Sequence, residues 1–312
     1  MPLLSVIIPC YYNEENLPVT LPRIEALCAK MPTGSEIEYV LVDDGSKDGT
    51  WAAIQDWHTK YPDRVQAIRL SRNFGSYNAA LAGMKYAAGD VNLVISADLQ
   101  DPPELIPKMF AYWQMGHKLV LANRTARSDG FFNDLFSNTY QRLLKRYALK
   151  NVPDGGFDVV MFDRQLRDEV VRINEKNTNT LYMLLWLKYD YVSIPYERQK
   201  REVGKSRWTL RKKIKLLIDT FVSFSFFPIR AITTLGFLLG FLAIIYSLVI
   251  IIGHIFGWGF VQGWSSMMIV VLFLGAFQMV ALGVIGEYVW RALDAARDRP
   301  NYIVDQIITK KS

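Results

Sequence analysis

The chain has 312 residues, 51% of them hydrophobic, which is enough for a full-size domain and a smaller additional region. Its formal net charge of +6 at pH 7 indicates an anionic partner: nucleic acid, a phosphorylated substrate or an acidic membrane surface. The two cysteines form no CxxC pair and the three histidines have no ligand spacing, which argues against a zinc site and favours a reducing compartment.

The first ten residues, MPLLSVIIPC, have no basic region and no small-residue cleavage site, so we expect a first strand there and no secretion signal. Short apolar segments then alternate with helical patterns. The expected strands are 4–9, 38–43, 65–70, 91–96 and 118–122, and the expected helices begin near Leu17, Thr50, Tyr77 and Pro103. This alternation predicts an α/β fold, with a mostly parallel sheet covered by helices on both faces.

Polar residues follow the predicted strands at the ends where parallel sheets bind their ligands. The first strand ends at Pro9, before Tyr11–Glu15; the others end in Asp43–Ser46, Ser71–Gly75 and Ala97–Asp101. Neither a P-loop motif nor the glycine-rich dinucleotide fingerprint occurs in the sequence. A nucleotide at this edge would therefore need a metal ion and side chains to hold its phosphates.

Asp98 and Gln100 are the candidate metal ligands. They are two residues apart, so in an extended backbone their side chains project to the same side. Oxygen ligands in this arrangement suit Mg²⁺ or Mn²⁺ that bridges a diphosphate and keeps several waters. The alternative is a helix-capping turn, in which Asp101 caps the helix that Pro102 or Pro103 begins. We assign Asp101 to the cap and Asp98 to the metal.

Residues 206–229 form a basic segment before the first long apolar stretch. Its apolar residues recur at helical spacing, and its cationic residues gather at one end. The two sets are Leu210, Ile214, Leu217 and Phe221, and Arg207, Arg211, Lys212, Lys213 and Lys215. The pattern predicts an amphipathic helix on an anionic membrane surface, with a solvated helix as the alternative. Because this segment accounts for much of the positive charge, the net charge no longer favours nucleic acid as a partner.

Two apolar stretches, about 231–253 and 266–289, are long enough to cross a bilayer as helices, and two buried core helices are the alternative. The connection between them has no Lys or Arg, whereas basic residues stand at both outer flanks, which predicts that these flanks are cytoplasmic. The flanking residues are Arg230, Arg291, Arg297 and Arg299. The expected organisation is a cytoplasmic domain at 1–205, the basic helix region at 206–229, a transmembrane hairpin at 230–290 and a cytoplasmic tail at 291–312.

Five motifs occur in order before the two apolar stretches: SVIIPCYYNEENL, LVDDGSKDGT, LSRNFG, SADLQDPPE and REVGKSRW. With these motifs, and with GVIGEYVWR at the end of the second stretch, the chain resembles the family 2 glycosyltransferases that attach a sugar to a polyprenyl phosphate. That group includes dolichol-phosphate mannose synthases, bactoprenol glucosyltransferases and aminoarabinose transferases of lipid A modification. The resemblance covers nearly the whole chain. It implies a GT-A fold, inverting transfer from a UDP-sugar, a divalent cation and a place in the inner membrane.

The resemblance also implies roles for individual residues. The nucleotide-sugar site would consist of Pro9, Tyr11, Glu14, Asp43, Asp44, Arg72, Ala97, Asp98 and Gln100. Within this set, Asp98 and Gln100 would hold the metal ion and the diphosphate. The chain has Ser96 where the usual D-x-D motif has its first acidic residue, so metal coordination would rest on fewer protein oxygens.

The implied acceptor is a phosphate monoester, whose second pKa near 6 makes it largely a dianion at neutral pH. Cations must offset its repulsion from the donor's diphosphate. The candidates are Arg124, after the fifth strand, and Arg201, Lys205, Ser206 and Arg207, for which a solvated basic loop is the alternative.

The segment VPDGGFDVVMFDR supplies Asp154 and Asp158 beside a Gly-Gly turn that permits close approach of the backbone to a ligand. The resemblance implies that Asp154 is the catalytic base. Because the acceptor is already mostly ionised, we expect instead that Asp154 orients the acceptor and the sugar. Asp158 is the second candidate, and a cap at the start of a strand explains it equally well.

Two other functions stay open at this stage. A processive polysaccharide synthase shares the nucleotide domain, but the QxxRW motif and the additional spans of that class are absent from the sequence. A non-catalytic membrane scaffold or lipid carrier would have no use for Asp98, Gln100 and Asp154. Glucose and uracil are expected from the closest resemblance, and Gly236 and Gly240, four residues apart, permit helix packing in a homo-oligomer.

Overall fold

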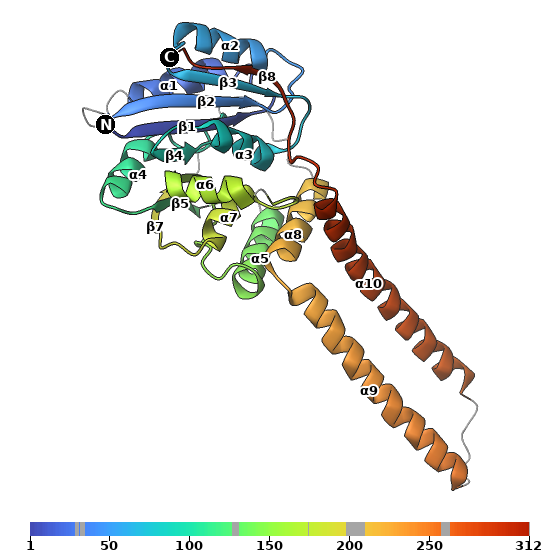
Figure 1. Ribbon diagram of the computed structural model, residues 1–312. Coiled ribbons are helices and arrows are strands. Elements are labelled where there is room, and N and C mark those ends of the chain that lie inside the picture. The colour runs from blue at the N-terminus through green and yellow to red at the C-terminus, as the bar shows by residue number, and fades with distance from the viewer. Residues whose placement is uncertain are drawn as a thin grey trace. The chain divides into compact units, whose positions relative to one another are not determined.

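The computed structural model describes residues 1–28, 31, 35–126, 131–173, 175–197, 210–256 and 263–311. The chain divides into two compact units, one made of Met1–Thr220 with Pro300–Ser312 and the other of Phe221–Arg299. The first unit contains the α/β sheet and the second contains two long apolar helices (Figure 1).

The sheet has eight strands in the order β7-β5-β6-β4-β1-β2-β3-β8. Their bounds are β1 Leu3–Cys10, β2 Glu36–Asp43, β3 Val65–Leu70, β4 Val91–Val94, β5 Leu119–Ala126, β6 Phe157–Asp163, β7 Val192–Glu197 and β8 Val304–Ile308. Strands β1 to β5 and β7 run in one direction, and β6 and β8 run in the other. The last residues of the six parallel strands and the first residues of β6 therefore share one edge, which we call the carboxyl edge.

Helices cover both faces of this sheet (Figure 1). One face carries α1 (Leu17–Cys28), α2 (Thr50–Lys60) and α4 (Leu105–Gln114); the other carries α3 (Ser76–Tyr86) and α6 (Arg164–Ile173), with α7 (Thr180–Trp186) packed beside them. Helix α5 (Phe131–Tyr147) connects β5 to β6. Strand β1 is buried on both faces because its side chains alternate between the two helical layers, which is why it reads as a continuous apolar run.

The C-terminal residues differ from the expected tail at 291–312. Residues up to Ala296 continue a helix, and Val304–Ile308 add β8 to the sheet, antiparallel to β3. The Ile303 carbonyl accepts the Ser71 N–H at 2.9 Å, and Lys310 Nζ lies 2.5 Å from the buried Glu38 carboxylate. A five-residue strand whose partner lies more than two hundred positions earlier has no local signal that sequence patterns detect.

Helix α8 (Leu210–Phe224) forms where the amphipathic helix was predicted, across the boundary between the two units. Helices α9 (Phe227–Ile255) and α10 (Trp264–Ala296) contain both expected spans. Their windows Phe227–Tyr246 and Ile269–Ala296, with mean hydropathy 1.9 and 2.4, are long and apolar enough to cross a membrane, and neither window is buried. Within this unit, Gly236 faces the Phe277 ring, so this glycine packs α9 against α10.

Candidate active site

The site residues on the carboxyl edge form two groups. The β1–β4 half consists of the last residues of β1 and β2 and the segments that follow β1 to β4, which together span 9–14, 43–50, 71–75 and 96–101. The β5–β6 half consists of residues 123–125 on β5, residues 154–158 at the start of β6, and Lys145 on α5. The structure thus brings the predicted nucleotide residues to one half and Arg124, Asp154 and Asp158 to the other.

The turn after β1 is held by side chains from the turn after β2. Ser46 Oγ accepts the Tyr12 N–H at 3.0 Å, and Thr50 Oγ1 accepts the Asn13 N–H at 2.8 Å. Tyr12 has φ 56°, a left-handed conformation that most side chains disfavour and that these bonds stabilise. Three predicted nucleotide residues lie here: Pro9 and Tyr11 are half-buried, and the exposed Glu14 accepts the Gly49 N–H at 2.9 Å.

Asp43 is a fully buried carboxylate at the end of β2. Its Oδ1 accepts the Ser46 N–H at 3.0 Å, and its Oδ2 lies 3.5 Å from Arg69 Nε. Among the described residues, Oδ2 has no hydrogen-bond partner. Burial raises the pKa of the Asp43 carboxyl above its ordinary value, while the bonds from Ser46 and the charge of Arg69 act in the opposite direction. An unmatched buried acceptor of this kind suits an N–H donor from a ligand.

Asp44 holds the loop after β3. Its two carboxylate oxygens accept the Phe74 N–H at 2.7 Å and the Gly75 N–H at 2.9 Å. The exposed Arg72 stacks on the Phe74 ring, 4.3 Å from the ring centroid. Gly45 has φ +67°, and a Cβ there would overlap the Arg72 backbone, so any other residue would strain this turn. Asp44 therefore fixes the loop that carries Arg72, and the nucleotide roles of both residues stay predictions.

The segment after β4 corrects two of the sequence expectations. The backbone at Asp98–Gln100 is a turn, with Leu99 in the left-handed region at φ 53°, so the extended geometry assumed for these two side chains is wrong. Asp101 is also no helix cap, because α4 begins at Leu105 after Glu104. Asp101 is instead buried and accepts bonds from the Ser96 hydroxyl at 2.8 Å and the Tyr196 hydroxyl at 2.5 Å.

Ser96 also lies 2.9 Å from Asp98 Oδ1, which accepts the Gln100 N–H at 3.3 Å. The carbonyl of the buried Ala97 accepts the Thr20 hydroxyl at 2.8 Å, which ties this turn to α1. Asp98 and Gln100 themselves are half-buried. The turn is thus anchored on both sides of Asp98.

Asp98 and Gln100 fit a divalent cation only as part of a shared coordination shell. Within the described ranges, no group of three His, Cys, Asp or Glu side chains is arranged to hold a metal ion. Mg²⁺ sites commonly use one or two carboxylates together with substrate phosphates and water. One carboxylate and one amide oxygen meet that requirement when a bound diphosphate supplies further ligands.

The β5–β6 half contains an ion pair between Arg124 and Asp158 on adjacent antiparallel strands. The Arg124 side chain is 10% exposed and that of Asp158 is 38% exposed. Gly155 has φ +80°, and a Cβ there would overlap the Arg124 carbonyl oxygen. The Gly-Gly turn is therefore needed for close passage against β5, as well as for any approach to a ligand.

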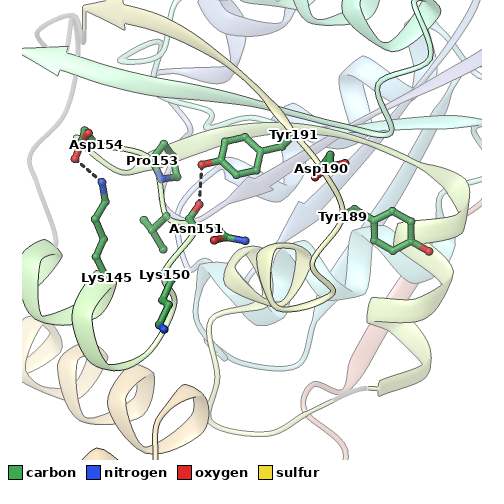
Figure 2. Close-up of a pocket in the computed structure, with 9 residues that line it drawn as sticks. Lys145, Lys150, Asn151, Pro153, Asp154, Tyr189, Asp190 and Tyr191 are labelled. Atoms are coloured by element: carbon green, nitrogen blue, oxygen red, sulfur yellow. Dashed lines mark hydrogen bonds and ion pairs between the residues drawn. The ribbon is translucent and has the colours of Figure 1, made fainter.

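Asp154 is an exposed carboxylate, with 97% of its side chain accessible, and it forms an ion pair with Lys145. Figure 2 shows Lys145 pointing at Asp154 along one side of a pocket of about 490 Å³, and the Tyr191 hydroxyl pointing at the Asn151 carbonyl. The Asp154 carbonyl accepts Asn123 Nδ2 at 3.3 Å. Asp154 is thus placed by its backbone, while its carboxylate reaches into solvent.

Four predicted phosphate ligands, Arg201, Lys205, Ser206 and Arg207, lie outside the described residues, and their roles stay predictions. The structure adds three residues that the sequence did not indicate: Arg69 beside Asp43, Lys145 beside Asp154 and Tyr196 beside Asp101. A charged residue inside the apolar strand β3 is a usable signal for Arg69. No local pattern marks Tyr196, whose partner is 95 residues away.

Comparison with known proteins identifies the family to which this architecture belongs. Residues 5–171 match the family described as Glycosyl transferase family 2. An uncharacterized glycosyltransferase of Bacillus subtilis, YkcC, is 34% identical over 97% of this chain and 93% of its own length. The undecaprenyl-phosphate 4-deoxy-4-formamido-L-arabinose transferase of an Enterobacter species is 30% identical over 99% and 94%, and a prophage-derived bactoprenol glucosyl transferase of Shigella flexneri is 30% identical over 96% and 97%.

The matched region 5–171 runs from β1 into α6, and it includes the whole β1–β4 half and the Asp154–Asp158 turn. The predicted GT-A architecture, a mostly parallel sheet with helices on both faces followed by two apolar helices, is confirmed. The chain is a glycosyltransferase and belongs to glycosyl transferase family 2.

Proposed function

We propose that this glycosyltransferase transfers a sugar, expected to be glucose, from a UDP-sugar to a polyprenyl phosphate, with inversion at the anomeric carbon. One observation carries the proposal: relatives named for transfer to undecaprenyl phosphate or for bactoprenol glucosyl transfer match 96–99% of this chain. Their similarity therefore extends past the family domain and through both apolar helices. A lipid-linked acceptor explains why a catalytic domain carries such helices.

The donor is assigned to the β1–β4 half. The unmatched Asp43 Oδ2 suits the ring N–H of uracil, and Pro9, Tyr11 and Glu14 lie in the adjoining turn. Asp98 and Gln100 would hold a divalent cation, Mg²⁺ or Mn²⁺, against the diphosphate. Such a cation stabilises the negative charge that develops on the leaving group.

The acceptor phosphate is assigned to the β5–β6 half, where Arg124 supplies a planar cation that matches phosphate oxygens. One oxygen of the acceptor attacks the anomeric carbon, the bond from that carbon to the diphosphate breaks, and UDP leaves. A single displacement of this kind inverts the anomeric centre. Asp154 orients the acceptor and the sugar, since a phosphate monoester at neutral pH has little need of a base.

The apolar helices anchor the protein in the membrane. A polyprenyl phosphate keeps its tail in the hydrocarbon and its phosphate at the headgroup level, so its transferase must act at that level. Basic residues flank both helices on their outer sides, and we infer from this that the catalytic domain and both termini lie in the cytoplasm.

The test is product formation by the full-length protein in membranes, with labelled UDP-glucose and undecaprenyl phosphate, with and without EDTA. The expected product is a lipid that carries one sugar. EDTA abolishes its formation, and Asp98→Asn slows it when UDP-glucose is limiting. A labelled polymer would indicate a processive synthase instead. A lack of transfer from UDP-glucose and from a panel of other nucleotide sugars would contradict an enzymatic role.

A further inference from the structure

Arg124 already has a counter-ion in the free protein, although it makes incomplete use of its donors. Nη2 of its guanidinium donates to Asp158 Oδ2, whereas Nε is buried and, in the part of the chain that is described, has no hydrogen-bond partner. An oxyanion that docks on the side of a guanidinium takes Nε–H and one Nη–H together. Asp158 therefore leaves one of these two donors unmatched.

Tyrosine hydroxyls from two helices also lie near Arg124. Tyr77 on α3 and Tyr182 on α7 are near the guanidinium: burial and the neighbouring Tyr140 raise the pKa of both hydroxyls, and the charge of Arg124 opposes this. Tyr140 on α5 donates to Thr220 Oγ1 on α8 at 3.1 Å. These neutral hydroxyls cannot balance the charge of Arg124. Among the described residues, Asp158 is therefore its counter-ion.

We propose that Asp158 occupies, in the free protein, the position on Arg124 that the acceptor's phosphate takes in the complex, so that acceptor binding exchanges one anion for another. This inference rests on the proposed function, because it requires a phosphate acceptor at Arg124. Asp158 is then a specificity-determining residue, and Asp154 alone of the two candidates acts on the substrates.

The exchange favours phosphate for two reasons. A phosphate monoester dianion carries more charge than a carboxylate and presents three oxygens, so it can match Nε and Nη2 together. A free polyprenol has neither the charge nor the second acceptor, and it leaves the Arg124–Asp158 pair in place. Asp158 thus excludes neutral alcohols from the site at the cost of some phosphate affinity.

The experiment measures binding of a short-chain, water-soluble prenyl monophosphate to the full-length protein in detergent, without donor, by isothermal titration calorimetry. Asp158→Asn should tighten binding about fivefold, because the competing charge is removed from a partly exposed pair. Asp158→Glu, which keeps the charge, should bind as the wild type does. Arg124→Met should weaken binding about tenfold or more, and the double variant Arg124→Met with Asp158→Asn should match it.

The matched control is Asp90→Asn, which removes the same charge from an Asp–Arg pair with Arg164, 2.9 Å apart, at the opposite edge of the sheet. It should leave binding unchanged. If Asp158→Asn does not fold, Asp158→Ser replaces it and should likewise tighten binding about fivefold.

Binding that is unchanged or weaker in Asp158→Asn, with a clear loss in Arg124→Met, would overturn the anion exchange and leave the acceptor assignment standing. Equal tightening in Asp158→Glu would also overturn it, because charge would not be the cause. Unchanged binding in Arg124→Met would show that the acceptor phosphate does not bind in the β5–β6 half. The proposed anion exchange would then be wrong as well.

Discussion

The two halves of the carboxyl edge are held together by different interactions. In the β1–β4 half, side chains bind backbone N–H groups: Ser46, Thr50 and Asp44 each fix a neighbouring turn in this way. In the β5–β6 half, charged side chains pair with one another, as in Arg124 with Asp158 and Lys145 with Asp154. Backbone turns are fixed before any ligand arrives, whereas an ion pair can be replaced by a charged ligand. The comparison supports our proposal that donor recognition is preformed and that acceptor recognition depends on exchange.

The largest expected effect that sharpens this comparison is that of Asp154→Asn. Turnover should fall about a hundredfold at every pH from about 6 to about 9, because an orienting carboxylate is lost while the acceptor stays ionised. The measurement is kcat with saturating donor and acceptor across that pH range. Recovery of turnover at high pH would show that Asp154 removes a proton, contrary to this account.

Gly155→Ala should damage the β5–β6 half selectively. The added Cβ would overlap the Arg124 carbonyl oxygen and force the turn away from β5, so kcat/KM for the acceptor should fall about tenfold while donor affinity is kept. The control is Gly116→Ala, since Gly116 also has a positive φ, +97°, but has open space around it. Equal losses for both variants would mean that backbone strain, and not the contact with Arg124, is responsible.

A smaller effect is expected from Lys145→Met, because its ion pair with Asp154 is largely exposed. The kcat should fall about threefold at low salt, and the difference from the wild type should shrink as salt rises. Lys150→Met, in the same pocket but not paired with Asp154, serves as the control. If the two lysine variants behave alike, Lys145 has no specific role in placing Asp154.

The last effect is on stability and not on turnover, and it concerns the β1–β4 half. The pKa of Asp43 is raised above its ordinary value of 3.8, so the folded protein holds this proton more tightly than the unfolded chain does. Stability is therefore lost as the pH rises from the unfolded pKa through the folded one. Asp43→Asn should remove that loss and stabilise the protein by about 1 kcal/mol at neutral pH, while it weakens nucleotide binding.

Urea unfolding followed by tryptophan fluorescence at several pH values measures this change, with the exposed Asp63→Asn as control. The gain from Asp43→Asn should shrink as the pH falls. A gain that is the same at all pH values would show that the ionisation of Asp43 is not its cause.

Sequence patterns predicted the β1–β4 half better than the β5–β6 half, for a physical reason. Strand ends and turns are local, so Asp43, Asp44 and Asp98 could be placed at one edge without a structure. The pair of Arg124 with Asp158 joins residues 34 positions apart through strand pairing, which no local pattern specifies. Strand β8 escaped prediction for the same reason.

Two local predictions of backbone geometry and capping also failed. The backbone at Asp98–Gln100 is not extended, because Leu99 adopts a left-handed conformation. Asp101 does not cap the helix because it is buried. A buried carboxylate needs hydrogen-bond donors, and the Tyr196 hydroxyl on β7 supplies one. Local propensity gave the position of the turn, and tertiary contacts decided its geometry.

The most direct test of the account compares initial rates for Asp98→Asn and Arg124→Met with both substrates varied. If donor and acceptor occupy separate halves of the carboxyl edge, Asp98→Asn raises the KM for the nucleotide sugar and Arg124→Met raises the KM for the polyprenyl phosphate, each leaving the other constant nearly unchanged. If both variants raise the KM of the same substrate, the division of the edge is wrong.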